Sequence, residues 1–95
     1  MFKKDLLEGK RILITGGGTG LGKEMANHFA EHGAELYICG RRENVLKETS
    51  DEISNKHGSK VHYQTLDIRA SKDVDDYVQS IFDEGLLDGL VNNAA

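Results

Sequence analysis

Proline is absent from this chain of 95 residues, and so are low-complexity tracts and linker-like stretches. Nothing in the sequence therefore marks an internal domain boundary, and the length allows one small domain. The single cysteine, Cys39, excludes an internal disulfide, and its apolar neighbours favour a buried structural thiol over a nucleophile. The four histidines lack the spacing of metal ligands, so we expect no metal site.

An excess of basic residues is also missing, because the formal net charge is −4 at pH 7. Nucleic acid is therefore not expected as a partner. No apolar run approaches the roughly 20 residues that a membrane span needs. The first residues, Met-Phe-Lys-Lys-Asp, do not contain the apolar core of a signal peptide. Together these absences predict a soluble, cytoplasmic protein with no membrane partner.

What is present is a regular alternation of short apolar runs with amphipathic segments. The runs predict strands at residues 11–14, 35–39, 60–66 and 87–91. The intervening periodicity predicts three helices: residues 21–32 with Leu21, Met25 and Phe29 on one stripe; residues 43–56 with Leu46, Thr49 and Ile53; and a third with Ser71 as N-cap and the stripe Val74, Tyr77, Val78, Ile81 and Phe82. Strands alternating with helices predict an α/β protein with a doubly wound parallel sheet.

A glycine-rich loop between the first predicted strand and helix is the most informative segment. Residues 15–22 read Thr-Gly-Gly-Gly-Thr-Gly-Leu-Gly. Glycines let the backbone approach a pyrophosphate, and the start of a helix offers free N–H groups and positive potential. The usual dinucleotide fingerprint fails, because Leu21 stands where its third glycine would be. Thr15, Gly16, Gly20 and Gly22 fit another pattern, in which three residues and then one residue separate the glycines.

Two other interpretations of this loop stay open at this point. Gly17 to Lys23 also matches the start of the P-loop of nucleoside triphosphatases. The next residue should be Ser or Thr to hold magnesium, but it is Glu24, whose charge would repel phosphates. Alternatively, the glycines serve only the close packing of a helix against a strand.

A pair of arginines follows the second predicted strand. In dinucleotide-binding folds a carboxylate at this place holds the ribose 2′-hydroxyl of NAD. Here the sequence has Gly40, Arg41 and Arg42. Guanidinium groups bind a 2′-phosphate in a bidentate manner, whereas cations at a helix N-terminus are otherwise disfavoured by the helix dipole. The pair therefore predicts NADP(H) rather than NAD, against the alternative of two solvated loop residues.

In order and spacing, these features resemble the first part of the short-chain dehydrogenase/reductase family. The resemblance implies a partial Rossmann-type sheet with four strands in the order 3-2-1-4 and three helices. It also implies that Asp67 and Ile68 contact the adenine of the cofactor and that Asn93 and Ala94 line its ribose. The complete set of expected cofactor-binding residues is Thr15, Gly16, Gly18, Thr19, Gly20, Leu21, Gly22, Arg41, Arg42, Asp67, Ile68, Asn93 and Ala94.

A finer resemblance concerns the subgroup. Ala95 departs from the Asn-Asn-Ala-Gly segment that is usual after the family's fourth strand. Alanine at this place, the loop Gly-Gly-Gly-Thr-Gly-Leu-Gly and a basic pair after the second strand are together similar to enoyl- and 2,4-dienoyl-CoA reductase-like members. The resemblance therefore suggests this subgroup.

The family resemblance implies an NADP(H)-dependent oxidoreductase that transfers hydride to or from a carbonyl, a hydroxyl or an activated alkene. The family's catalytic Ser, Tyr and Lys lie beyond the fourth strand, and no tyrosine here has a lysine four residues later. We therefore expect residues 1–95 to be the NADP(H)-binding segment, truncated before the catalytic part, with no catalytic residue and no activity alone. A non-catalytic nucleotide-binding or assembly module is the alternative. Apolar residues along the fourth strand predict a homo-oligomer.

Overall fold

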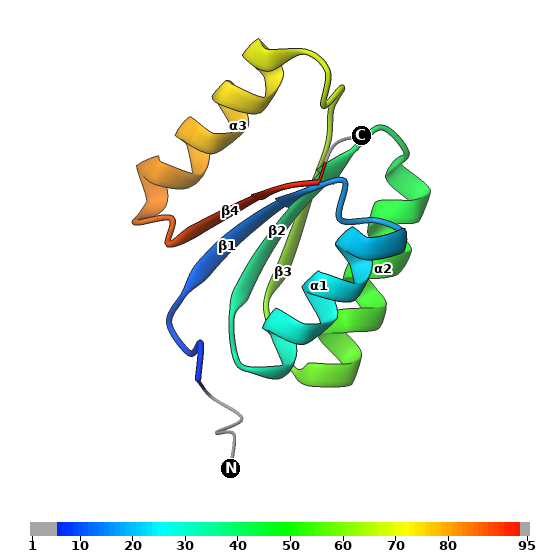
Figure 1. Cartoon of the computed structure of the whole chain (residues 1–95), viewed down its shortest axis with the longest axis vertical. Helices are drawn as coiled ribbons and strands as arrows, with labels where there is room; N and C mark the ends of the chain where they lie inside the picture. The colour runs from blue at the N-terminus through cyan, green and yellow to red at the C-terminus, as the bar shows by residue number, and fades with distance from the viewer. Residues whose placement is uncertain (1–5, 94–95) are drawn as a thin grey trace.

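The computed structural model describes residues 6–93, which form a four-stranded parallel sheet with three helices. The elements are β1 (Arg11–Thr15), α1 (Gly20–Glu31), β2 (Glu35–Gly40), α2 (Glu43–His57), β3 (Val61–Thr65), α3 (Ser71–Glu84) and β4 (Gly89–Asn92). The strand order is β3-β2-β1-β4, with α1 and α2 on one face of the sheet and α3 on the other (Figure 1). The predicted doubly wound α/β fold and its strand order are confirmed.

Parallel pairing brings the carboxyl ends of all four strands to one edge of the sheet. There Thr15 pairs with both Cys39 and Asn92, and Gly40 pairs with Thr65. The loops that lead into α1, α2 and α3 leave from this edge (Figure 1). In open α/β sheets, ligands bind at this edge, where the strand order changes direction.

The two central strands, β1 and β2, are buried on both faces, which explains their continuous apolar character. Ile12, Ile14, Leu36 and Ile38 pack on the α1 and α2 side, against buried helix residues that include Ala26, Ala30, Leu46 and Ile53. On the other side Leu13, Tyr37 and Cys39 pack against Ile81 of α3. At about 25 cal/mol per Å² of apolar surface, burial of this kind is the main stabilising contribution to such a sheet.

The buried face of α1 differs from the predicted one. The helix begins at Gly20, and Leu21 is 62% exposed, so Leu21 is not part of the core. The buried residues are Gly22, Ala26 and Ala30. These small residues let the helix backbone lie close to the sheet, and Met25 and Phe29 are left partly buried at the side of this face.

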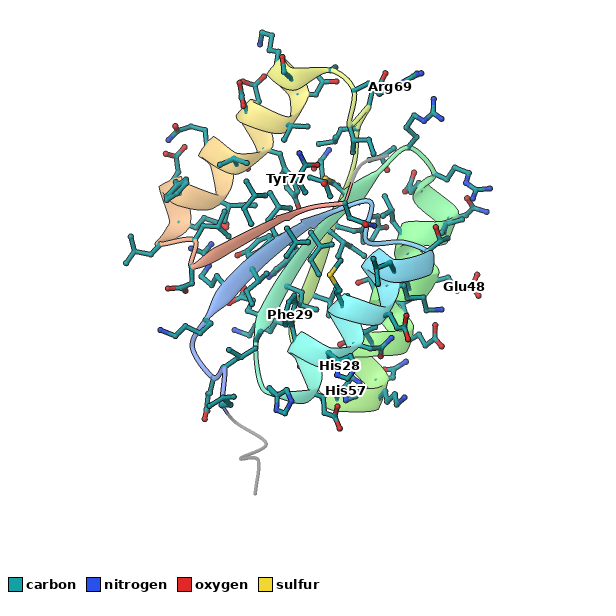
Figure 2. The ribbon with its side chains drawn as sticks, in the orientation of Figure 1. His28, Phe29, Glu48, His57, Arg69 and Tyr77 are labelled. Atoms are coloured by element: carbon teal, nitrogen blue, oxygen red, sulfur yellow. The ribbon has the colours of Figure 1, made fainter. Side chains whose placement is uncertain are left out.

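The third helix is also less buried than its periodicity predicted. Ile81 is its one fully buried residue, while Phe82 is 45% exposed. Figure 2 shows Tyr77 on the side of α3 that faces the sheet. Burial raises the pKa of its hydroxyl, which has no hydrogen-bond partner within residues 6–93. The predicted N-cap is wrong by one residue, because Ala70 occupies this position and α3 has no side-chain cap bond.

The fourth strand begins at Gly89 rather than at residue 87. The main-chain N–H of Arg11 donates to Oδ2 of Asp88 at 2.9 Å, and the Asp88 N–H donates to the Arg11 carbonyl at 2.8 Å. The Arg11 guanidinium also bonds the Leu86 carbonyl at 3.0 Å. Residues 86–88, which connect α3 to β4, are therefore held against Arg11 of β1 before the regular pairing of β4 starts.

Candidate functional site

The glycine-rich loop lies at the carboxyl edge of the sheet, between β1 and α1. Gly20 has φ +58°, a left-handed conformation that residues with a Cβ seldom adopt. The first N–H groups of α1 have no partner within the helix, and Thr19, its N-cap, makes no side-chain cap bond. This helix start is therefore able to donate hydrogen bonds to an anion, as the sequence predicted.

Gly22 is required by a close approach of two main-chain segments. A Cβ at this position would clash with the Gly16 carbonyl oxygen and would lie 2.8 Å from Nδ2 of Asn93. The absence of a side chain therefore lets the first turn of α1 lie directly against the loop. The last glycine of the predicted pattern thus has a packing role, one of the interpretations that the sequence left open.

Thr15 and Asn93 connect the ends of β1 and β4. The Thr15 hydroxyl donates to Oδ1 of Asn92 at 3.1 Å and accepts from the Asn93 N–H at 3.0 Å. Nδ2 of Asn93 donates to the Gly16 carbonyl at 3.4 Å. These contacts tie the start of the glycine loop to the end of β4. Contacts of Thr15 and Asn93 with the cofactor stay predictions. Ala94, the other residue expected at the ribose, lies outside the described residues.

A groove of about 400 Å³ runs from the glycine loop to the start of α2. Six of the predicted site residues line it: Gly16, Gly18, Thr19, Arg41, Arg42 and Ile68. The other lining residues are Cys39, Gly40, Val45 and Leu46, and none of the ten carries a carboxylate. Of the remaining predicted residues, Thr15, Gly20, Leu21, Gly22, Asp67 and Asn93 do not line the groove.

Sequence reasoning missed how α2 supports the loop. The Thr49 hydroxyl, which is buried, donates to the Gly18 carbonyl at 2.7 Å. Val45 and Leu46 lie so close to Gly18 that a Cβ there would be 3.2 Å from Cγ1 of Val45. The available signal was a threonine within the apolar stripe of α2, where a buried hydroxyl needs a hydrogen-bond partner.

Two arginines lie at the α2 end of the groove. Arg42 is the N-cap of α2, Arg41 precedes it, and both side chains are exposed. Within residues 6–93 neither guanidinium forms an ion pair, although the charge of Arg41 reaches the carboxylate of Asp67. The electrostatic character of this part of the groove is therefore positive, at a helix end whose dipole is positive as well.

Cys39 lines the groove from the end of β2 and is fully buried. Burial raises the pKa of its thiol to about 11, and the opposite effect of the Gly16 main-chain N–H is smaller. The thiol is therefore neutral near pH 7, which agrees with the predicted structural role. No group of three or more His, Cys, Asp or Glu in residues 6–93 is arranged to hold a metal ion.

Lys23 does not face the groove. Its ammonium group forms an ion pair of 2.7 Å with Glu52 of α2 instead of staying solvated, as the sequence had suggested. The P-loop lysine must reach the phosphates of a nucleotide, and this pairing turns Lys23 to the neighbouring helix. The geometry therefore disfavours the P-loop interpretation. None of the helices described in residues 6–93 is long and apolar enough to cross a membrane.

Together the parallel sheet, the glycine loop and the groove define a Rossmann-type NAD(P)-binding region. Residues 10–95 match the family model described as short chain dehydrogenase. A 3-oxoacyl-[acyl-carrier-protein] reductase of Chlamydia muridarum is 40% identical over 90 residues, which are 94% of this chain and 36% of that protein. A peroxisomal 2,4-dienoyl-CoA reductase of Arabidopsis thaliana is 38% identical over 95 residues, which are 99% of this chain and 32% of that protein.

A solved structure agrees with these sequence relatives. L-Sorbose reductase from Gluconobacter frateurii, complexed with NADPH and L-sorbose, superposes with a TM-score of 0.89 and 32% identity, over 98% of this chain and 36% of that chain. The chain belongs to the short-chain dehydrogenase family of oxidoreductases. It spans about a third of the length of the relatives that it matches.

Proposed function

We propose that residues 1–95 form the NADP(H)-binding segment of a short-chain dehydrogenase/reductase that transfers hydride to or from a carbonyl, a hydroxyl or an activated alkene. The bound nicotinamide would supply or accept the hydride, and this segment would bind and orient the cofactor. The observation that carries the proposal is the groove between the glycine loop and α2. Its lining contains Arg41 and Arg42 and no carboxylate.

The charge of this lining favours a cofactor that carries a 2′-phosphate. Such a group has about −1.5 to −2 charges near pH 7 if it resembles other phosphate monoesters. A carboxylate at the end of β2 would repel it, whereas two exposed guanidinium groups without ion pairs in residues 6–93 are available to it. NADPH rather than NADH is therefore the proposed ligand, and the NADPH complex of L-sorbose reductase supports the choice.

Catalysis is proposed to need parts of the family fold that this segment does not supply. Tyr37, Tyr63 and Tyr77 lie in β2, β3 and α3, and none has a lysine four residues later. None of the three lines the groove beside the glycine loop. We therefore expect the chain to bind cofactor without turnover. The relatives act on several kinds of substrate, so the enoyl- or 2,4-dienoyl-CoA reductase subgroup stays a prediction.

Isothermal titration tests the cofactor assignment. Charge-assisted bonds contribute about 1.5 to 3 kcal/mol each, so the double variant Arg41→Ala/Arg42→Ala should bind NADPH about tenfold or more weakly. Binding of NADH should be nearly unchanged. Lys56→Ala, which removes an exposed cation at the far end of α2, is the matched control and should alter neither. Equal losses for NADPH and NADH would contradict the assignment.

Self-association is a further part of the proposal. β4 pairs with β1 on one side, and Leu90 in β4 is 55% exposed and Leu86 76% exposed. An apolar strand edge favours pairing with another chain. We expect the weight-average mass in sedimentation equilibrium to rise with concentration, and less so for Leu90→Lys. A monomer at high concentration would contradict this expectation.

A further inference from the structure

A buried hydrogen bond joins α2 to the part of the glycine loop that lines the groove. The Thr49 hydroxyl donates to the Gly18 carbonyl at 2.7 Å, and Thr49 is 2% exposed. Within residues 6–93 no other donor bonds this carbonyl. Gly18 is itself buried, with the apolar side chains of Val45 and Leu46 beside it. The Thr49 hydroxyl thus satisfies a buried acceptor that would otherwise lack a partner.

This bond fixes the orientation of the peptide unit between Gly18 and Thr19. In a trans peptide the C=O and the N–H point in opposite directions, and residues 6–93 contain no cis bond. Since the Gly18 carbonyl points to Thr49, the Thr19 N–H points away from it. Thr19 is exposed and lines the groove, and within residues 6–93 its N–H bonds no acceptor. The peptide unit therefore keeps a donor free for a ligand in the groove.

The opposite orientation of this peptide is open to the loop, because Gly18 has no Cβ to oppose the rotation. That orientation would turn the carbonyl oxygen outward, where it would repel a phosphate instead of binding it. Without the Thr49 hydroxyl, the inward carbonyl would have no donor beside Val45 and Leu46, and the cost of an unpaired buried acceptor would favour the rotation. Thr49 therefore decides whether the N–H or the C=O of this peptide faces outward.

We propose that Thr49 is a positioning residue that holds the peptide between Gly18 and Thr19 with its N–H toward the pyrophosphate of the cofactor. This inference rests on the proposed function, in which a dinucleotide occupies the groove. The pyrophosphate is common to NADPH and NADH, so the Thr49 hydroxyl supports the binding of both. Its role is thus distinct from that of Arg41 and Arg42, which are assigned to the 2′-phosphate.

Isothermal titration with NADPH and NADH tests this role in three variants of α2. Thr49→Val keeps the shape of the side chain without the hydroxyl and should weaken both ligands by the same factor, roughly three- to tenfold. Thr49→Ser keeps the hydroxyl and should bring both affinities back to within about twofold of wild type. Ser50→Ala is the matched control, because it removes another buried hydroxyl of α2, which donates to the Val61 carbonyl at 3.1 Å. It should leave both affinities within about twofold of wild type.

Two further measurements separate positioning from a general loss of stability. Urea unfolding should show comparable losses of stability in Thr49→Val and Ser50→Ala, since each variant loses one buried hydrogen bond. In the isotope-labelled wild-type chain, the amide proton signal of Thr19 should move downfield as NADH is added, because the N–H gains an acceptor. This measurement requires no variant, so it tests the orientation of the peptide even if Thr49→Val does not fold.

The outcomes separate this inference from the cofactor assignment. Unchanged affinities in Thr49→Val, equal losses in Thr49→Val and Ser50→Ala, or no recovery in Thr49→Ser would overturn the role of Thr49 and leave the proposed function standing. The same holds for a Thr19 signal that stays in place while that of Leu21 moves. A loss in Thr49→Val confined to NADPH would place the peptide at the 2′-phosphate and also overturn the inference. A wild-type chain that binds neither NADPH nor NADH would overturn the proposed function and this inference with it.

Discussion

The two ends of the sheet use arginine in opposite ways. At the amino ends of the strands, Arg11 donates from Nη2 to the Tyr37 hydroxyl at 2.7 Å and to the Ile81 carbonyl at 3.1 Å, and from Nη1 to the Leu86 carbonyl at 3.0 Å. At the carboxyl ends, Arg41 and Arg42 are exposed and form no ion pair within residues 6–93. The Arg11 guanidinium thus links β1 to β2 and to the end of α3. The guanidinium groups of Arg41 and Arg42 are available to a ligand.

The same contrast extends to the residues around them. The amino end depends on side chains that are present: Arg11, Glu35, Tyr37 and His62 form one network, with the rings of Tyr37 and His62 stacked at 4.6 Å between centroids. The carboxyl end depends on side chains that are absent, as at Gly22. Adding a Cβ at Gly22 should therefore disturb packing at the carboxyl end. Removing side-chain atoms from the network should lower the stability of the amino end.

The largest effect is expected at Gly22. In Gly22→Ala the added Cβ meets the Gly16 carbonyl, so α1 must move away from the loop, at a cost of about 3 kcal/mol in the free energy of unfolding. Cofactor affinity should fall as well. Gly89→Ala is the matched control, because its Cβ would lie 3.5 Å from Cγ1 of Ile12, an ordinary contact. Urea unfolding of both variants measures the difference, and equal destabilisation would contradict the packing argument.

Removing the Arg11 guanidinium should have the next largest effect. Arg11→Met keeps much of the aliphatic part but leaves the carbonyls of Ile81 and Leu86 without their donor, which costs about 2 kcal/mol. NADPH affinity should stay within about twofold, because Arg11 lies at the opposite end of the sheet. Arg41→Met should do the reverse, with stability changed by less than about 0.5 kcal/mol and NADPH affinity clearly reduced. Matching losses of stability in both variants would remove the contrast between the two ends.

A smaller effect concerns pH at the amino end. Burial opposes the ionisation of Glu35, but the hydrogen bond and charge of His62, the Tyr37 hydroxyl and the charge of Arg11 outweigh it, so the pKa of Glu35 is lowered. A lowered pKa in the folded state gives stability that is present above the unfolded pKa and is lost as pH falls through the folded pKa. The free energy of unfolding should therefore decline below about pH 4.5, the usual pKa of this carboxyl.

Urea unfolding of Glu35→Gln between about pH 3 and pH 7 checks this expectation. The variant should lose part of the acid-dependent decline. Glu48→Gln makes the same change in net charge on the outer side of α2, where Figure 2 shows Glu48 pointing away from the sheet. The difference between the two variants isolates the network of Tyr37 and His62. An identical pH profile for both variants would show that this network contributes nothing.

The smallest effect is expected at Lys23, which is close to the glycine loop in sequence but pairs with Glu52. Exposed ion pairs of this kind contribute little to stability. Lys23→Ala should leave NADPH affinity within about twofold, and the wild-type chain should show no magnesium-dependent binding of ATP in titration. ATP binding that depends on Lys23 would favour a P-loop and contradict the role of the carboxyl end as a dinucleotide site.

The sequence allowed prediction of features that rest on local chemistry. Strand and helix periodicity, the glycine loop and the basic pair after β2 are local patterns, and each predicted element is found with bounds shifted by a few residues. The strand order came from the family resemblance and is also observed. The roles of individual site residues toward the cofactor stay predictions, because the fold places them without testing their contacts.

Features that depend on distant partners could not be predicted. Arg11 was placed in a strand, but its partners Ile81 and Leu86 are 70 and 75 residues away in the sequence. The stripe of α1 was misjudged at Leu21 because periodicity shows which residues share a face, not how closely the helix approaches the sheet. Thr49 was predicted as a core residue, and only the fold brings its hydroxyl to the Gly18 carbonyl.

A chemical-shift map of the isotope-labelled chain, recorded with and without NADPH, tests the central claim most directly. The account predicts that amide signals of residues 16–22 and of Arg41 and Arg42 move with increasing NADPH, and that those of Arg11, Tyr37 and His62 do not. Weaker shifts at Arg41 and Arg42 are expected with NADH. Shifts confined to the network of Arg11, Tyr37 and His62, or no shifts at the glycine loop, would contradict the assignment of cofactor binding to the carboxyl end of the sheet.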